Sequence, residues 1–135
     1  NLLIGERTAE ELKITLGSAS IEKAQGSMQV RGRDMVTGLP RVVEVPAKEI
    51  AVAMSEIIHQ ILDAVKDVLE QTPPEISADV IDHGIVLTGG GAMLRHLAEM
   101  ISKETQVPAF VANDPLDCVA LGTGAILANP SLMKK

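Results

Sequence analysis

The sequence contains almost no aromatic residues and only one cysteine. Phe110 is the single aromatic side chain, although 46% of the 135 residues are hydrophobic, so the core must be aliphatic. Cys118 has no second cysteine with which to pair, which excludes a disulfide within the chain and fits a reducing compartment. Because no base or cationic partner accompanies it, we interpret Cys118 as a small core residue.

Basic blocks and long apolar runs are also missing. The net charge is −6 and the basic residues are scattered, so the electrostatic footprint of a general nucleic-acid-binding protein is absent. No apolar run approaches the ~20 residues needed to span a bilayer, and no signal-peptide pattern is present. The length suits one domain or two small lobes that share a core. The apolar run at residues 2–4 favours a fragment of a longer chain, because it resembles the end of an element already under way.

The other predictions depend on the glycine-rich segment at residues 84–94. Residues 85–88 are apolar or β-branched, which predicts a short buried strand. Three glycines follow at 89–91, and then a helical pattern begins whose inward-facing residues are Met93, Leu94, Leu97, Met100 and Ile101. Glycines let the backbone approach a ligand closely, and the free N–H groups of a helix start favour anions. The segment therefore favours a nucleotide or phosphate site, with a plain strand-to-helix turn as the alternative.

A short helix near the start of the chain supplies a second candidate. Thr8 and Glu11 have the spacing of a capping box, which predicts a helix with Thr8 as its N-cap and Gly17 as its C-terminal stop. Glu10 and Lys13 are three residues apart and therefore lie on one face of this helix. They can form a solvated ion pair, or they can line a pocket wall and reach the polar edges of a ligand.

A β-hairpin and a long helix follow. Alternating residues at 28–32 and a β-branched run at 42–45 predict the hairpin, whose tip carries Arg31, Arg33 and Asp34 as solvated charges. Apolar residues at three- and four-residue spacing predict a helix of roughly 24 residues that begins near Pro46 and ends before the Thr72-Pro73-Pro74 segment. Its stripe must pack on something large, such as a sheet, and consists of Ile50, Met54, Ile57, Ile58, Ile61, Val65, Val68 and Leu69.

Several polar residues could be mistaken for reactive groups. We interpret His59 as structural, because no nucleophile or carboxylate motif accompanies it. Asp79, Asp82 and His83 lie at the end of a predicted helical turn at residues 75–82 and favour a solvated or capping role. No second cluster with metal-ligand spacing exists in the sequence. We therefore predict neither a catalytic residue nor a metal ligand within this chain.

The remaining elements complete an α/β order. A strand at 106–111 and a small-residue helix at 116–127 are predicted, the latter packed tightly against a neighbour, and Pro130 ends regular structure before the polar tail Lys134–Lys135. The order is helix, two strands, long helix, strand, helix, strand, helix. The contiguous glycines do not match the G-x-G-x-x-G dinucleotide fingerprint, and Ala92-Met93 stand where a P-loop needs a lysine.

At the level of motifs, the chain resembles the bacterial actin-like, rod-shape-determining MreB family over essentially its whole length. The matching segments are 3–10 (LIGERTAE), 31–34 (RGRD), 37–40 (TGLP), 72–75 (TPPE), 84–94 (GIVLTGGGAML), 114–116 (DPL) and 118–124 (CVALGTG). The resemblance implies an actin-like ATPase (ribonuclease H-like) α/β fold, of which this chain is the second lobe. Residues 1–46 would form a small β-containing outer subdomain, 47–113 the α/β core, and 114–135 a helix that returns toward the missing first lobe.

The resemblance also implies an ATP-binding cleft between two lobes, with Mg in the full-length protein. One side of the adenosine would face Glu10, Lys13, Ile14 and Leu16. Gly89, Gly90, Gly91, Ala92, Met93 and Leu94 would close the other side, and Leu116 or Asp117 would border the adenine. Nothing in this chain resembles the family's phosphate-binding hairpins or its metal-positioning carboxylates. We therefore expect the isolated chain neither to hydrolyse ATP nor to bind it tightly.

Further expectations concern assembly. The family resemblance implies nucleotide-dependent filaments in the cytoplasm at the inner face of the cell membrane, which organise cell-wall synthesis and maintain rod shape. The partners would be filament neighbours of the same protein, a membrane-anchored adaptor and the cell-wall elongation machinery, whereas the inner membrane surface would be contacted by missing segments. One departure is His96, which stands where the family usually has glycine and which we expect to be tolerated on a helix.

Two alternatives remain open at this point. One is another member of the same superfamily, such as a sugar or acetate kinase or an Hsp70-like chaperone. A kinase would need a substrate-binding aspartate in the missing lobe, and a chaperone would need a downstream peptide-binding domain. The other is a non-catalytic interaction module, whose hairpin at 29–45 and long helix would dock to neighbouring subunits or to a membrane-anchored adaptor.

Overall fold

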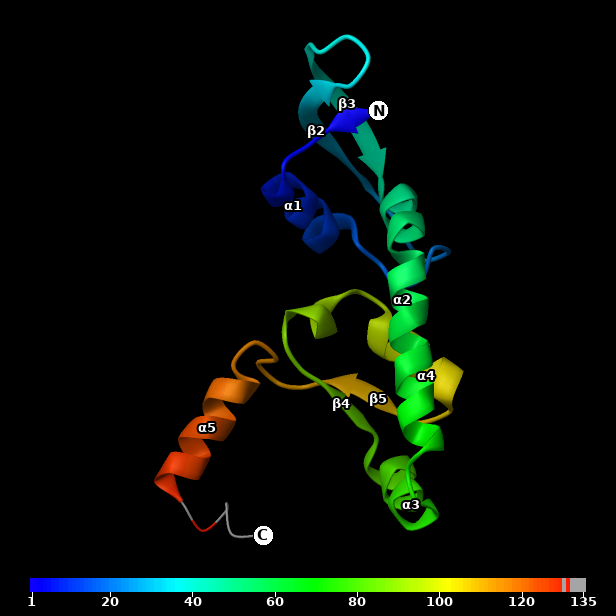
Figure 1. Cartoon of the computed structure of the whole chain (residues 1–135), viewed down its shortest axis with the longest axis vertical. Coiled ribbons are helices and arrows are strands. Elements are labelled where there is room, and N and C mark those ends of the chain that lie inside the picture. Colours follow the sequence, from blue (N-terminus) through cyan, green and yellow to red (C-terminus); the bar gives the residue numbers. More distant parts are fainter. Residues whose placement is uncertain (130, 132–135) are drawn as a thin grey trace.

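A long central helix organises the molecule. The computed structural model describes residues 1–129 and 131, so the predicted stop at Pro130 and the polar tail Lys134–Lys135 lie outside the described residues. Helix α2 (Ala47–Glu70) runs along the long axis, with a small antiparallel sheet at one end and a parallel strand pair further along (Figure 1). Helix α5 (Cys118–Ala128) stands to one side. The predicted span of the long helix is confirmed.

The small sheet contains the predicted hairpin. Strands β2 (Ser27–Asp34) and β3 (Pro40–Pro46) pair antiparallel with Val30 opposite Val43, and β1 (Leu2–Leu3) pairs with the other edge of β2. The pairing of β1 with β2 requires glycine at position 32, because a Cβ there would lie 2.4 Å from the Leu3 carbonyl oxygen.

The hairpin turn is held by Asp34, which was expected to be a solvated charge. That expectation is wrong, because Asp34 is buried. One carboxylate oxygen accepts the N–H groups of Val36 and Thr37 at 2.8 and 2.9 Å, and the other accepts from Arg41 Nη1 at 2.8 Å. The hydrogen bond from the Thr37 N–H, then those from Arg41 and Val36, hold the pKa of Asp34 far below its ordinary value of 3.8. Arg31 and Arg33 are exposed, as predicted.

Helix α1 (Glu6–Leu16) begins three residues earlier than the capping-box pattern predicts. Gly5 is the N-cap, its carbonyl oxygen accepts the Ala9 N–H at 3.0 Å, and Thr8 lies inside the helix. The Thr8 cap is therefore wrong, because the chain leaves β1 and enters the helix directly at Gly5. The predicted end is confirmed, since Leu16 is the last helical residue and the Gly17 N–H donates to the Lys13 carbonyl at 2.9 Å.

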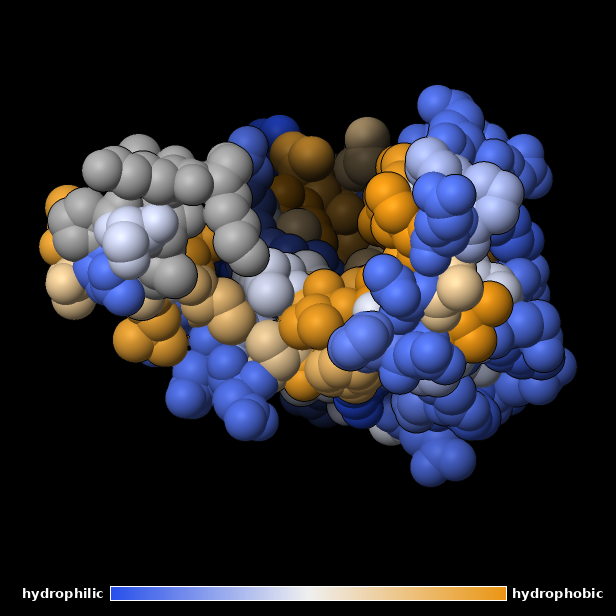
Figure 2. All heavy atoms as spheres, turned by 90° about the horizontal axis from the view of Figure 1, so that it is seen from below, coloured by the Kyte–Doolittle hydropathy of each residue, from blue (hydrophilic) through white to orange (hydrophobic). Residues whose placement is uncertain are grey.

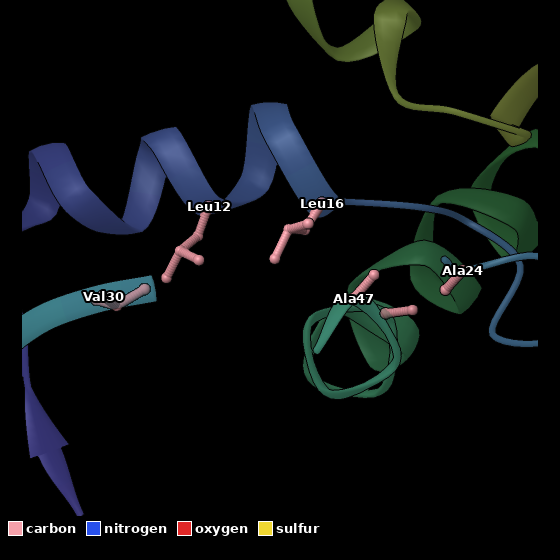
Figure 3. Packing of buried hydrophobic residues seen from close by; sticks show 6 residues of the cluster. Leu12, Leu16, Ala24, Val30 and Ala47 are labelled. Carbon is pink, nitrogen blue, oxygen red and sulfur yellow. The ribbon is translucent and has the colours of Figure 1, made fainter. Parts of the chain in front are cut away.

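Two small aliphatic cores share helix α2. The first joins α1, β2 and the start of α2 through Leu12, Leu16, Ala24, Val30, Ala47 and Ala51 (Figure 3). The second contains Ala19, Ile58, Leu62, Leu97 and Ile101. The first core contains residues from both sides of the predicted boundary between residues 46 and 47, since it includes Ala47 and Ala51. The division of the chain at this boundary stays a prediction.

The predicted stripe of α2 is only partly covered. Ile58 is 2% exposed, whereas Ile57 is 58% exposed and Ile61 and Val68 are also open to solvent. Strands β4 (Ile85–Leu87) and β5 (Ala109–Val111) pair in parallel and pack, together with helix α4 (Leu97–Thr105), on one side of α2. Two three-residue strands are too short to cover the whole apolar face, so the remainder of the stripe stays open.

Other elements differ from the sequence patterns in detail. Helix α3 (Pro74–His83) forms where a helical turn was predicted. The predicted buried strand at β4 is half open, with Val86 52% exposed, and the strand predicted at 106–111 begins only at Ala109.

No described residue of α5 is buried, and Cys118 is half-buried with its thiol directed at the carbonyls of Asn113 and Asp114. The expected tight packing of α5 and core position of Cys118 are therefore wrong for the described residues.

Within the described part of the chain, no helix is both long enough and apolar enough to cross a bilayer.

Adjacent isoleucines on α2 provide a matched test of the core assignment. Ile58→Ala removes buried methyl and methylene groups from the second core and should lower the free energy of unfolding by about 2–4 kcal/mol. Ile57→Ala changes an exposed side chain and should cost less than about 1 kcal/mol. Urea denaturation followed by circular dichroism measures both variants, and equal losses would contradict the assigned core face.

Acid should weaken the hairpin turn through Asp34. A depressed pKa means that the carboxylate contributes stability at neutral pH that is lost as the pH falls below 3.8 toward the folded-state pKa. Asp34→Asn keeps an acceptor for the turn but cannot titrate, so its melting temperature should be lower at pH 7 and should fall less than the parent's from about pH 4 to pH 2. Asp79→Asn, at an exposed position, is the control. Identical acid profiles for the two variants would show that Asp34 does not hold the turn.

Candidate functional site

The glycine-rich segment forms a compact turn after β4. Gly89 has a φ of +81°, which favours glycine, and its N–H donates to the Pro115 carbonyl at 2.7 Å. The short 3₁₀ helix η1 (Gly90–Met93) follows, with the Leu94 N–H bonded to the Gly91 carbonyl at 3.1 Å. Helix α4 begins only at Leu97. The prediction that the glycines lie at the start of the amphipathic helix is therefore wrong, and the anion-binding argument based on that helix end does not apply.

One side of this glycine turn is open. A Cβ at Gly91 would meet no atom within 4 Å, and one at Gly90 would lie 3.5 Å from the Leu116 side chain. Met93 is 59% exposed, contrary to its predicted inward position. Ala92 is buried and Leu94 packs on the second core. A flat ligand can therefore approach the backbone at Gly90 and Gly91, beside Met93 and Leu116.

The predicted residues of α1 divide between surface and core. Lys13 Nζ and Glu10 Oε2 form an ion pair at 2.7 Å with both side chains about half exposed, and Ile14 is 70% exposed. Leu16 is buried in the first core. Glu10, Lys13 and Ile14 can therefore face a ligand, whereas Leu16 supports the helix from behind.

Arg95 joins the end of α1 to the glycine turn. Its Nε donates to the Gly17 carbonyl and its Nη2 to the Thr15 carbonyl, both at 3.0 Å. The Ala19 N–H donates to the Arg95 carbonyl at 2.8 Å, and the Leu94 side chain packs against Gly17. Figure 1 shows the loop that carries η1 below the end of α1. The structure therefore brings the last turn of α1 and the residues directly after the glycine turn together.

His96 extends this junction in an unexpected conformation. It precedes α4 with φ +66° and ψ +6°, in the left-handed region, so the expectation that it lies on a helix is wrong. Its Nδ1 lies 2.9 Å from Oγ of Ser18, a residue with no exposed surface. Sequence patterns do not reveal the roles of Arg95 and Ser18, because their contacts join residues about 80 positions apart and leave no local pattern.

The remaining polar candidates make local contacts. Nδ1 of His59 bonds to the Ser55 carbonyl at 2.7 Å, and Nδ1 of His83 bonds to the Asp79 carbonyl at 2.9 Å. Among the described residues, no group of three or more His, Cys, Asp or Glu side chains is placed to hold a metal ion.

Ion pairs away from the glycine turn tie α4 to its neighbours. Lys66 pairs with Glu104 at 2.8 Å, and this contact raises the pKa of Lys66 and lowers that of Glu104. A hydrogen bond from Lys23 likewise lowers the pKa of Glu99. A hollow of about 130 Å³ lies beside Lys23, His96 and Glu99, and a shallow open depression lies on the surface of α2 beside Val52. Neither the hollow nor the depression includes a predicted nucleotide-binding residue.

Comparison with known proteins gives consistent matches. The family model described as MreB/Mbl protein matches residues 1–135. The cell shape-determining protein Mbl of Bacillus subtilis is 48% identical over 134 residues, which cover 99% of this chain and 40% of that protein. The cell shape-determining protein MreB of Escherichia coli is 46% identical over 125 residues, covering 93% of this chain and 36% of that protein. The chain thus spans about 40% of the length of the curated relatives it matches.

Solved structures agree on the fold. The crystal structure of MreB5 of Spiroplasma citri bound to ADP superposes with a TM-score of 0.90 at 36% identity, covering 99% of this chain and 40% of that one. The MamK double helical filament gives a TM-score of 0.67 at 21% identity over 85% of this chain and 35% of that one, which bears on the fold alone. The chain therefore has the α/β fold of one part of the larger actin-like proteins, and it belongs to the MreB/Mbl family.

Proposed function

We propose that this chain is part of an ATP-dependent, actin-like cytoskeletal filament protein that organises cell-wall synthesis and maintains rod cell shape. Its relatives in Bacillus subtilis and Escherichia coli are named cell shape-determining proteins. MreB5 of Spiroplasma citri, which matches over 99% of this chain, has been crystallised with ADP and with AMPPNP. Within the whole protein, this chain supplies the adenosine side of the nucleotide cleft and contacts for the filament.

The observation that carries the nucleotide proposal is the open glycine turn joined to the end of α1. Gly91 leaves room for a flat group against the backbone, and Arg95 holds the last turn of α1 next to the residues that follow η1. Lys13 and Glu10 offer a donor and an acceptor to the polar edges of a nucleoside. The turn can therefore act as one wall for the adenosine and α1 as the other.

The phosphates and Mg belong to other parts of the protein in this proposal. The described residues contain no cluster of carboxylates that could hold a metal ion, and three N–H groups of the glycine turn, at Gly89, Ala92 and Leu94, are bonded to backbone carbonyls. When bound, ATP would supply the free-energy difference between filament states through its hydrolysis. The residues of this chain would bind and orient the adenosine.

Assembly is the second part of the proposal. The hairpin projects from one end of the molecule and exposes Met35, Val36 and Leu39 at its turn (Figure 1). Exposed apolar side chains at a projecting tip suit contacts with a neighbouring subunit. Filaments of this protein would lie in the cytoplasm at the inner face of the membrane and would bind a membrane-anchored adaptor and the cell-wall elongation machinery.

Electron microscopy of the full-length protein tests the filament proposal. With Mg and ATP we expect filaments with a regular longitudinal repeat, and with no nucleotide we expect fewer or none. A superfamily kinase or chaperone would remain as discrete particles under both conditions. Discrete particles at all nucleotide and protein concentrations would therefore reject the cytoskeletal function.

A glycine substitution tests the adenosine wall. Gly91→Val places a side chain in open space, so the fold should tolerate it, but the side chain would occupy the volume that the adenosine needs. In the full-length protein we expect the Kd for a fluorescent ATP analogue to rise at least about tenfold, which corresponds to ~1.4 kcal/mol. Gly5→Val is the matched control, since Gly5 is also open and has an extended backbone that valine readily adopts. Unchanged affinity in Gly91→Val would place the adenosine elsewhere.

A further inference from the structure

Arg95, which lies about 80 positions further along the chain, donates hydrogen bonds to carbonyl groups at the C-terminal end of α1. The last carbonyl groups of a helix lack partners within the helix and carry partial negative charge. The planar guanidinium group reaches two of these oxygens, at Thr15 and Gly17, through Nε and Nη2. Lys13 lies in the same last turn of α1. A movement of Arg95 would therefore move the part of α1 that carries the proposed nucleotide contact.

His96 adds a second tie at the same junction. The Ser18 hydroxyl donates its proton to the Ser20 carbonyl at 2.8 Å, and its oxygen accepts the Ser20 N–H at 3.1 Å. The Ser18 hydroxyl also forms a hydrogen bond with His96 Nδ1 at 2.9 Å, in which the imidazole tautomer decides which group donates. Ser18 has no exposed surface, so this hydrogen bond ends on a buried residue.

His96 forms its hydrogen bond to Ser18 from a left-handed backbone conformation that histidine disfavours. A φ of +66° is a conformation that glycine adopts easily and that a histidine adopts at a cost. A strained residue persists only where its surroundings hold it. Here the surroundings are the Ser18 hydroxyl and the neighbouring strand-like pairing between Ser18 and Arg95.

We propose that Arg95 and His96 are positioning residues of the nucleotide site, which fix the spacing between the α1 wall and the glycine-turn wall without touching the nucleotide. Arg95 follows Leu94 directly, and Leu94 is the last residue of the predicted glycine-turn wall. The two residues therefore link both walls across a gap of about 80 positions in the sequence. This inference rests on the proposed nucleotide-binding function.

The test uses the full-length protein and three variants. Arg95→Met removes both hydrogen bonds to α1, Arg95→Lys keeps the charge but not the planar fork, and His96→Gly removes the tie to Ser18 while relieving the backbone strain. Gln106→Gly is the matched control. Gln106 also has a left-handed backbone, with φ +60°, and also loses one hydrogen bond, to the Lys103 carbonyl, but it lies at the far end of α4.

Two quantities are measured for each variant: the Kd for a fluorescent ATP analogue and the melting temperature. We expect the Kd to rise about tenfold in Arg95→Met and less in Arg95→Lys, a tenfold change being ~1.4 kcal/mol. In His96→Gly we expect the Kd to rise about threefold to tenfold although the melting temperature is unchanged or higher. Competition by magnesium tripolyphosphate, which has no adenosine, should be unchanged in all variants. Gln106→Gly should leave the Kd unchanged.

The outcomes separate this inference from the function on which it rests. If the unaltered protein binds the analogue and Arg95→Met and His96→Gly bind it equally well, the positioning role is rejected while the nucleotide site stands. If affinity falls only in proportion to melting temperature, or falls equally for tripolyphosphate, the residues act on general stability and the positioning role is again rejected. If the unaltered protein binds no nucleotide, the proposed function and this inference both fail.

Discussion

Helix α2 belongs to both of the small aliphatic cores, and the relative placement of the other elements follows from this. The chain contains a single aromatic residue, and each of the two buried clusters contains only small and medium aliphatic side chains. The first half of α2 contributes Ala47 and Ala51 to one cluster, and its later turns contribute Ile58 and Leu62 to the other. A continuous helix is stiff, so it fixes the relative position of the sheet and the strand pair.

The same arrangement explains why a second connection near the glycine turn matters. Helix α1 packs in the first core and α4 in the second, and hydrogen bonds from Arg95 and His96 join the end of α1 to the start of α4. The unpaired carbonyls at the end of α1 need donors, and Arg95 supplies them from the second half of the chain. Figure 2 shows apolar residues gathered on α5 and on the face of the body across a hollow from it. No described residue of α5 is buried, and Val119, Leu121 and Leu127 are exposed.

Sequence patterns predicted the elements better than the contacts between them. The hairpin, the span of α2 and the end of α1 at Gly17 follow from local rules of periodicity and glycine or proline punctuation. Asp34 was misjudged, because its burial comes from a turn that wraps the carboxylate with its own N–H groups and with Arg41. Thr8 was misjudged because the strand before it allows the helix to begin earlier. The role of Arg95 could not be predicted, since it depends on carbonyl groups about 80 residues away.

If the last turns of α1 and the glycine turn are two walls around one adenosine, 8-azido-ATP bound to the full-length protein should photolabel both. After peptide mapping we expect label in both segments 10–16 and 89–94, and we expect unlabelled ATP to suppress labelling of both in parallel. Label confined to other segments, or suppression of one segment without the other, would contradict this arrangement.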